Sequence, residues 1–519
     1  MWNNIPWHPS NGGHPSNGAK PPRTAVLGLD ELRRRMKPDS EGPWIQYLDV
    51  SKDPTICVSE TLNFSDPKFL RLQFLDLRYC GLGEIHGLQF LVSLSSLNLD
   101  NNNLTTVPGL SHLHRLKTLS LRFNELTGEV LDLHGLYWLW HLNLSHNPIG
   151  VLPVSLQSST QLTHLNLDYC QLTDFSAIEG ITSLQVIKVN NNLLKGCLSL
   201  KKLVHLKRIE ACNNQFTSVD FGKTLFNRLE YLIFYNNQIT ELPRVSAPNL
   251  LEVNFIKNNI KVVHAIGPKT RGSPKSPYHV GLEWPNLVGL LLDENKLTAI
   301  SFGYFKRLGE VSLDGNALSV FPKFAAPEVL NKFSISMNLI TQVPDLDKFT
   351  GLEYFDISNN LVTCIGNIAG CSKLVELVMS GNRLDYPCMV QLAYGLSETP
   401  IEALDINNMP VPFALGSVKT LRRLEFTPGD VPITLGGLDI NPVFGHMDIK
   451  HHWSNTFFPY PNVPQNLEII ACFGKPCRQT IFMLFLCIQR LAQSGGPYVY
   501  SDLTNMIFSY WQAKDFPRW

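Results

Sequence analysis

Aromatic and arginine side chains recur at a regular spacing in the first half of the sequence. Phe123, His146 and Tyr169 follow one another at steps of 23 residues, and an arginine precedes both Tyr79 and Phe123. When such side chains are exposed, they supply much of the binding energy at protein interfaces. We therefore predict that their chemistry is recognition of a protein surface. The predicted binding residues are Arg78, Tyr79, Arg122, Phe123, His146 and Tyr169, with a second group at Tyr231, Tyr235 and Lys257.

The equivalent positions of the second half of the chain are mostly acidic. A single exposed residue of this kind is ordinary on any surface, whereas adjacent columns of them are informative. The change of sign along the chain indicates a partner of mixed charge. The acidic residues are Asp293, Glu294, Glu310, Asp314, Asp356 and Glu376.

Two thiols and several imidazoles near the end of the sequence could in principle hold zinc. His446, His451, His452, Cys472 and Cys477 fall within one segment. The C-x4-C spacing is at the loose end of the usual range, so buried cysteines and surface histidines are the favoured interpretation. We predict no metal and no cofactor.

Motifs for catalysis are absent from the sequence. It contains no G-x-x-x-x-G-K-[ST], no G-x-G-x-x-G after a strand, no H-E-x-x-H and no G-x-S-x-G. These patterns mark phosphate-binding loops, dinucleotide sites, zinc proteases and nucleophilic hydrolases, respectively. We therefore predict that the chain is not an enzyme.

The elements that must position the binding residues follow from a repeat, L-x-x-L-x-L-x-x-N-x-L, with most steps at 22 or 23 residues. Its L-x-L core alternates as a short strand does, with the leucines inward and the intervening residues outward. One unit cannot bury its apolar edge alone, so neighbouring units must stack. The inward strand positions are Leu75, Leu97, Leu119, Leu142, Leu165, Ile187, Ile209, Leu232, Val253, Leu290, Val311, Phe333, Phe355 and Leu377.

Over roughly residues 44–430 this pattern resembles the leucine-rich-repeat family, in an intracellular type with mixed repeat lengths. The resemblance implies an α/β solenoid: a curved horseshoe with a parallel concave β-sheet, an N-terminal cap and a partly helical C-terminal segment. It also implies a non-enzymatic scaffold that binds a protein partner on the concave face.

A ladder of asparagines is expected where the chain leaves each strand, because the amide can satisfy backbone groups of the turn and of adjacent units. Two units have cysteine there instead, a replacement that is common in the family and that tolerates burial. The predicted ladder is Cys80, Asn102, Asn124, Asn147, Cys170, Asn192, Asn214, Asn237, Asn258, Asn295, Asn316, Asn338, Asn360 and Asn382.

The composition along the chain predicts four segments. A disordered tail is followed by a cap, because an open end of a solenoid must be covered. An insertion interrupts the repeats; a solvated loop is favoured there, and a phosphorylated docking element at Ser273 or Ser276 is the alternative. The predicted segments are 1–26 (tail), 27–64 (N-terminal cap), 65–430 (repeats, with the insertion 264–284) and 431–519 (C-terminal cap).

Two helices are expected in the last segment, Gln479 to Ala492 and Asp502 to Trp511. A pair that caps the open edge of the solenoid is the favoured interpretation. The first helix also faintly resembles that of the suppressor-of-cytokine-signalling box, which implies an alternative function as the substrate receptor of a cullin-type ubiquitin ligase. A regulatory subunit of a phosphatase or small-GTPase pathway is the other alternative, by analogy of fold alone.

The totals indicate a compartment and exclude some partners. Lys plus Arg and Asp plus Glu each number 44, so no broad basic field is present to hold nucleic acid. The N-terminal sequence predicts no signal peptide, and the longest apolar run, Ile481 to Ile488, is too short to span a bilayer. We expect a cytoplasmic, intracellular monomer that binds protein, with no nucleic acid and no membrane span.

Overall fold

The computed structural model describes most of the repeat region and short pieces around it. The chain forms two compact units, residues 1–183 (the first unit) and 184–519 (the second unit). The predicted C-terminal helices and most of the predicted tail and insertion lie outside the described residues. These are 26–27, 37–38, 45–49, 57–58, 61–65, 67–261, 263, 284–302, 305–409, 415, 418–426 and 448–451.

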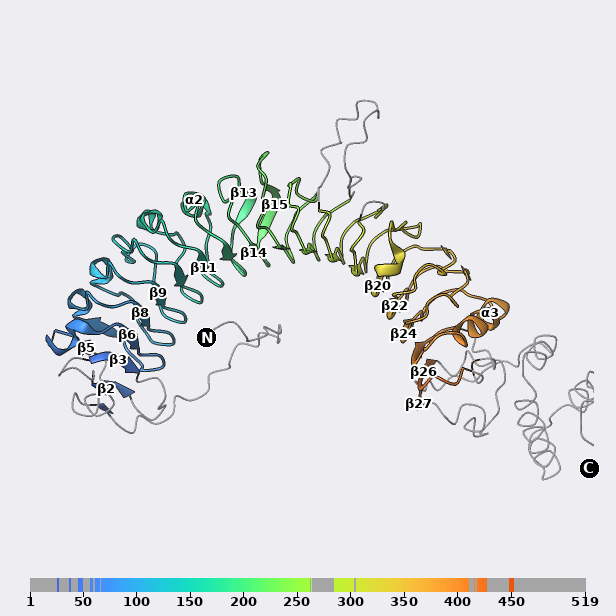
Figure 1. Cartoon of the computed structure of the whole chain (residues 1–519), viewed down its shortest axis with the longest axis horizontal. Coiled ribbons are helices and arrows are strands. Elements are labelled where there is room, and N and C mark those ends of the chain that lie inside the picture. Colours follow the sequence, from blue (N-terminus) through green and yellow to red (C-terminus); the bar gives the residue numbers. More distant parts are fainter. Residues whose placement is uncertain are drawn as a thin grey trace, which may run out of the picture. The chain divides into compact units, whose positions relative to one another are not determined.

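The first unit is built on short parallel strands stacked in sequence order (Figure 1). Leu97 pairs in register with Leu75 on one side and with Leu119 on the other, and Leu119 pairs with Leu142. The predicted neighbours are therefore confirmed. The strands are β3 (Ile45–Asp49), β6 (Phe74–Asp76), β8 (Ser96–Asn98), β9 (Thr118–Ser120), β10 (His141–Asn143) and β11 (His164–Asn166).

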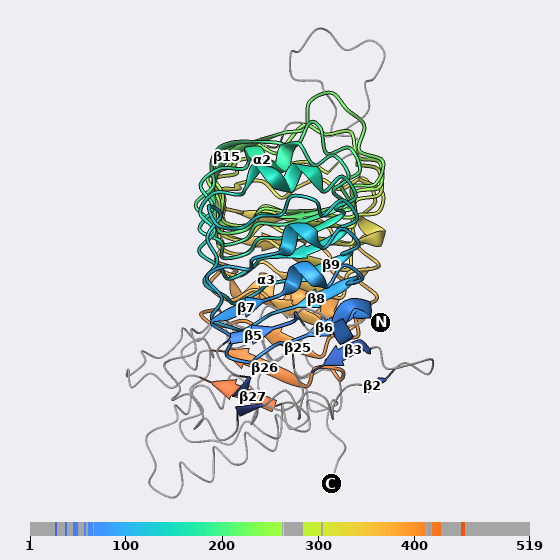
Figure 2. The same ribbon diagram turned by 90° about the vertical axis from the view of Figure 1, so that its left-hand side faces the viewer.

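The described return segments of the first unit contain at most a single helical turn or a very short strand, so the described part of the unit has little helix. The short helices lie one above another on the side away from the sheet (Figure 2). They are η1 (Pro67–Arg71), η2 (Leu88–Phe90), η3 (Leu110–His112), η4 (Val154–Ser158) and α2 (Ser176–Glu179). The short return strands are β4 (Cys57–Val58), β5 (Thr61–Asn63) and β7 (Glu84–His86). Two further short strands precede β3: β1 (Val26–Leu27), which pairs with β4, and β2 (Lys37–Pro38), which pairs antiparallel with β3.

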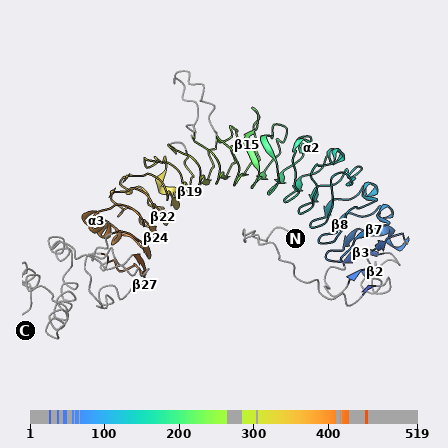
Figure 3. The ribbon, with the colours of Figure 1, turned by 180° about the vertical axis from the view of Figure 1, so that it is seen from behind.

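The second unit continues the same construction over more repeats (Figure 3). Its main sheet is parallel and in register from β12 onward. The strands are β12 (Val186–Lys188), β14 (Arg208–Glu210), β16 (Tyr231–Ile233), β17 (Glu252–Asn254), β18 (Gly289–Leu291), β19 (Glu310–Ser312), β20 (Lys332–Ser334), β22 (Tyr354–Asp356), β24 (Glu376–Val378), β25 (Ala403–Asp405), β26 (Arg423–Phe426) and β27 (Asp448–His451).

Outside that sheet, the described returns of the second unit contain short paired strands and two helices. Among the described helices α3 is the longest, and it begins after Asp385, whose side chain accepts a hydrogen bond of 2.9 Å from the backbone N–H of Cys388. Such a bond satisfies one of the donors left open at a helix start. The elements are β13 (Lys195–Ser199), β15 (Gln215–Asp220), η5 (Pro327–Val329), β21 (Gln342–Val343), β23 (Cys364–Ile365) and α3 (Tyr386–Leu396).

Three observations refine the predicted segment boundaries. Val253 on β17 pairs directly with Leu290 on β18, so the insertion leaves the sheet unbroken. Trp284, which the sequence assigned to the insertion, is 2% exposed and its indole N–H donates to the carbonyl of Val245 at 3.1 Å. Trp284 is therefore part of the repeat core, and this hydrogen bond satisfies the indole N–H that burial would otherwise leave without a partner. β27 lies beyond the predicted end of the repeats at 430 and pairs with β26.

In the three-residue strands of the main sheet the central residue is buried and its two neighbours point outward, which creates what we call the sheet face. In β8, for instance, Leu97 is 1% exposed whereas Ser96 and Asn98 are partly exposed. Fully burying a leucine side chain contributes roughly 1.5–3 kcal/mol. Repetition of this pattern along the described strands supplies the core, and it places every outward side chain on one continuous surface within each unit.

The asparagine at the end of each strand links its own repeat to the one before. The Nδ2 of Asn102 donates to the carbonyl of Leu77 at 2.9 Å, and its Oδ1 accepts from the backbone N–H of Leu82 at 3.0 Å. In the second unit, Asn237 bonds Ala211 and Phe216 in the same way, at 2.9 and 3.1 Å. Each amide thereby satisfies backbone groups that would otherwise be buried without partners.

Cysteine replaces asparagine at two ladder positions of the first unit. The Sγ of Cys170 donates to the carbonyl of Leu144 at 3.2 Å, and the Sγ of Cys80 lies 3.6 Å from the carbonyl of Arg78. Both residues are buried, and burial raises the pKa of the Cys170 thiol to about 12. A thiol in this state is a poor nucleophile, so the geometry favours a structural role for Cys170.

Candidate functional site

In the repeats of both units the chain leaves the strand through a residue with a left-handed backbone. In the first unit four of these residues carry rings: Tyr79, Phe123, His146 and Tyr169, with φ of 60°, 53°, 58° and 57°. A left-handed backbone costs a side chain with a Cβ roughly 1–2 kcal/mol, a cost that only Gly and, in part, Asn and Asp avoid. The second unit mostly has such residues there, namely Asn191, Asn213, Asn236, Gly315, Asn359, Gly381 and Asn408.

Three of the four rings stack on one another and form what we call the aromatic ladder: Phe123, His146 and Tyr169. The centroids of Phe123 and His146 are 4.0 Å apart, and those of His146 and Tyr169 are 4.5 Å apart. The guanidinium of Arg122 lies 4.5 Å from the Phe123 centroid and extends the stack. Phe123 is 39% and Tyr169 48% exposed. The structure thus brings together four of the six residues predicted in this half of the chain.

Arg122 is positioned by a neighbouring carboxylate that the predicted set did not include. Asp100 accepts a hydrogen bond of 2.7 Å from the backbone N–H of Arg122 and one of 2.6 Å from the Ser120 hydroxyl. Burial raises the pKa of Asp100 above its usual range. The signal in the sequence was its place in the repeat, one unit before Arg122.

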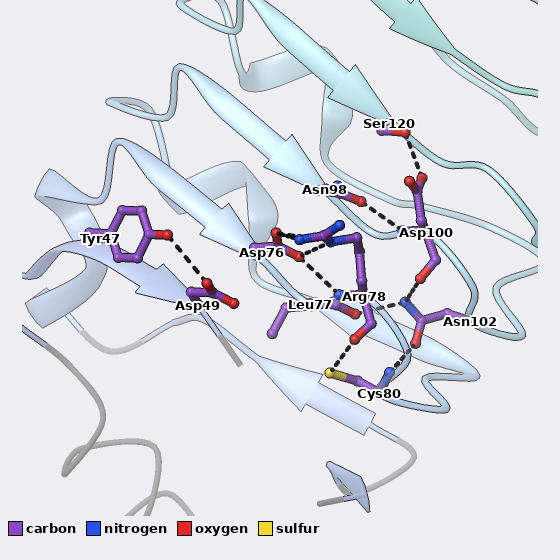
Figure 4. A network of polar contacts seen from close by, with 10 residues as sticks. All are labelled: Tyr47, Asp49, Asp76, Leu77, Arg78, Cys80, Asn98, Asp100, Asn102 and Ser120. Carbon is purple, nitrogen blue, oxygen red and sulfur yellow. Dashed lines mark hydrogen bonds and ion pairs between the residues drawn. The ribbon is translucent and has the colours of Figure 1, made fainter. Parts of the chain in front are cut away.

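Arg78 and Tyr79 are separate from the aromatic ladder. The Arg78 side chain faces Asp76, with its Nε 3.0 Å from both carboxylate oxygens (Figure 4). Asp76 is itself 3% exposed, so this ion pair is part of the packed surface. Tyr79 is 65% exposed, and the repeat that carries Asn101 lies between it and Phe123. Arg78 is therefore less available to a partner than its type suggested.

The second predicted group forms two separate contacts in the second unit. The guanidinium of Arg208 lies 4.6 Å from the Tyr231 ring, a partner that the prediction missed. The Lys257 ammonium lies 5.6 Å from the Tyr235 ring and 3.2 Å from a carboxylate oxygen of Glu294. The charge of Lys257 is thus already engaged.

The acidic residues of the second unit bond to their neighbours along the sheet face. Asp293 accepts from the Ser312 hydroxyl at 2.5 Å, and burial raises its pKa to about 6. Asp314 accepts from Ser334 at 2.6 Å. Glu310 pairs with Lys332 and Glu376 pairs with Arg423. Cross-strand bonds of this kind stabilise a sheet, so these acids have local partners.

A pair of histidines on the sheet face of the first unit was absent from the predicted set. His141 and His164 occupy the first positions of β10 and β11, and their ring centroids are 5.4 Å apart. Burial lowers the pKa of both, and the charge of His164 also lowers that of His141. The sequence could have indicated this pair, because the two histidines occupy the same position in successive repeats.

Acidification gives a test of how the aromatic ladder is held. Burial, followed by the charge of Arg122, lowers the pKa of His146 from 6.5 to about 4. The folded chain disfavours the protonated His146 ring. The stability that the neutral ring contributes is therefore present above pH 6.5 and is lost as the pH falls towards 4. We expect a change from about pH 7 to about 4.5 to lower the urea midpoint of the wild type more than that of His146→Asn. Equal decreases in the urea midpoint of the two proteins would contradict a buried, neutral His146 ring.

No group of three His, Cys, Asp or Glu side chains arranged for a metal ion occurs among the described residues. His446, His452, Cys472 and Cys477 lie outside them, and only the backbone of His451 is described. None of the described helices is long and apolar enough to cross a membrane.

Comparisons with known proteins agree with this geometry. Two leucine-rich-repeat family models match residues 138–159 and 158–177. Podocan of Mus musculus is 28% identical in an alignment of 306 residues that covers 53% of this chain and 49% of podocan. The chain thus spans about half the length of the curated relatives it matches.

Two solved structures share the fold. A TDR receptor aligns with a TM-score of 0.54 and 16% identity over 85% of this chain and 92% of its own. The functional domain of InlJ from Listeria monocytogenes, which includes a cysteine ladder, aligns with a TM-score of 0.50 and 18% identity over 71% and 75%. The in-register parallel strands, the asparagine ladder and these matches together place the chain in the leucine-rich-repeat superfamily.

Proposed function

We propose that this chain is a non-enzymatic interaction scaffold that binds a protein partner on the sheet face of its first unit, at Arg122 and the aromatic ladder. Proteins with this repeat generally mediate protein–protein interactions, which supports the class of function. The partner, a cytoplasmic location and a monomeric state remain predictions from the sequence.

The left-handed backbone of the aromatic ladder supports this surface as the binding site. Three rings sit on left-handed backbone positions where the second unit mostly has asparagine or glycine. The repeat can therefore close its turn without them, and at lower conformational cost. Backbone strain held in this way is a reason to look for a function at the site.

The chemistry of the surface fits protein recognition. Phe123 and Tyr169 are each stacked on His146 and thereby held in place. Little side-chain entropy is therefore lost when a partner covers them. The Arg122 guanidinium adds donors beside an apolar patch, and aromatic residues with arginine are the types that dominate binding hot spots. Asp100 holds the backbone of Arg122, and the guanidinium lies over the Phe123 ring.

Affinity purification of the intact chain beside the double variant Arg122→Glu with Phe123→Ala tests the proposal. We expect the partner to be recovered with the wild type and lost with the variant, by a factor of 100 or more on the basis of two hot-spot substitutions. Thermal unfolding should change little, since both side chains are partly exposed. Recovery of the same partners at equal yield would show that the aromatic ladder is not the binding site.

A further inference from the structure

Three aromatic side chains are exposed where the chain enters β10. Tyr137, Trp138 and Trp140 are 48%, 63% and 53% exposed, whereas Leu136 before them and Leu139 among them are fully buried. The two leucines fill the core, so the rings that flank them must point outward. Large apolar side chains gathered on a surface mark a binding site more often than single ones do.

Basic side chains from the preceding repeat border these rings. The backbone N–H of Trp140 donates to the carbonyl of Lys117 at 3.0 Å, which makes the two residues neighbours across the sheet. Arg115 occupies the position of Trp138 one repeat earlier, because β9 and β10 pair in register. Both cations are exposed, and neither has a carboxylate within ion-pair distance in the part of the chain that the structure describes.

We call the segments that lead into the strands of the first unit its entry edge, and this edge lacks acidic residues altogether. Acidic residues of these repeats lie outside these segments, in the turn after a strand (Glu125) or in the returns (Glu84 on β7 and Asp132). The entry edge therefore combines basic and apolar side chains without a carboxylate of its own. The entry edge comprises residues 70–73, 92–95, 114–117, 137–140 and 160–163.

We propose that the entry edge of the first unit binds the surface of an anionic phospholipid bilayer. Indole and phenol rings are enriched at the membrane–water interface, and nearby Lys and Arg are attracted to anionic headgroups. The exposed aliphatic side chains at the same edge, Leu70 (40%) and Val92 (51%), favour lipid over nucleic acid. Aliphatic groups can enter the acyl boundary, whereas single-stranded nucleic acid stacks on aromatic rings. This surface is separate from the aromatic ladder.

Vesicles of phosphatidylcholine with and without phosphatidylserine test the proposal, with the full chain in a sedimentation assay. We expect binding only with phosphatidylserine present, and weaker binding as salt rises. The double variant Trp138→Ala with Trp140→Ala should lose it. Lys117→Glu changes the charge by two units and should weaken it by roughly thirtyfold.

Two matched control variants test whether the loss of vesicle binding is specific to the entry edge. They change a charge and remove an exposed ring elsewhere in the chain. Lys207→Glu alters the equivalent position in the second unit, where the lysine is ion-paired with Glu230 at 3.2 Å. Tyr79→Ala removes an exposed ring that lies away from the edge. Both should bind vesicles as the wild type does, with all variants sharing its circular dichroism.

Three results would overturn the proposal. The first is equal sedimentation with both lipid compositions, and the second is equal binding by the tryptophan variant and the wild type. The third is binding to an oligothymidylate, lost in the tryptophan variant, without binding to vesicles. That third result would assign the edge to nucleic acid.

Discussion

Replacing Phe123, His146 and Tyr169 together with asparagine should abolish partner capture without lowering the free energy of unfolding. Asparagine adopts the left-handed backbone more readily, so each substitution relieves about 1 kcal/mol. The loss of two ring stacks costs about 0.5–1.5 kcal/mol each, and the loss of the cation–π contact costs about 0.5–1 kcal/mol. These terms nearly cancel, so the midpoint of urea unfolding should stay within error of the wild type.

The binding effect is large because the variant removes the whole apolar part of the proposed site. We expect a loss of at least a hundredfold in affinity for the captured partner, since hot-spot residues act together. Tyr79→Asn is the matched control: it makes the same change at another left-handed position outside the aromatic ladder. It should keep binding and gain slightly in stability.

A marked loss of stability in the triple variant would show that the rings hold the turns together and that their left-handed backbone has no net cost. Unchanged affinity with unchanged stability would show instead that the partner binds elsewhere. The two outcomes are distinguished by measuring affinity and urea unfolding on the same preparations.

Gly128→Ala should destabilise the first unit by about 3 kcal/mol or more, at the upper end for an added methyl group. A Cβ at Gly128 would lie 1.6 Å from the carbonyl oxygen of Val151. The backbone N–H of Gly128 also donates to Ile149 at 2.9 Å, so the two segments are already bonded to each other. Since a backbone carbonyl cannot turn away as a side chain can, neighbouring repeats would have to separate.

Gly150→Ala provides the matched control for this substitution. Gly150 has a φ of 66°, yet nothing lies within 4 Å of the position that a Cβ would take. Its substitution should therefore cost only the left-handed backbone, about 1–2 kcal/mol. Urea unfolding with hydrogen exchange over the first unit measures both variants. Equal losses in the two would contradict the close approach of Gly128 to Val151.

The sequence by itself determined the register of the repeats. Leucine at alternate positions and asparagine at the strand ends recur at steps of 22 or 23 residues. Only stacked parallel strands can bury these leucines and satisfy the hydrogen bonds of these asparagine amides. The pairing of Leu97 with Leu119 and of Leu119 with Leu142 follows from that periodicity. Columns of outward residues could be predicted for the same reason.

Which members of a column touch one another was decided only by the tertiary structure. Arg78 and Arg122 look equivalent in the sequence, but Arg78 is bonded to Asp76 whereas Arg122 lies over Phe123. The choice depends on rotamers and on which acceptor lies nearest, and neither follows from spacing.

The backbone conformation at the strand ends was likewise outside the reach of the sequence pattern. Residue type predicts asparagine or glycine at a left-handed position, so Phe123, His146 and Tyr169 gave no sign of it. Their φ values reflect the closure of each turn onto the next repeat. The repeat determines where these rings lie, and the packing of neighbouring turns determines that they are held there at a conformational cost.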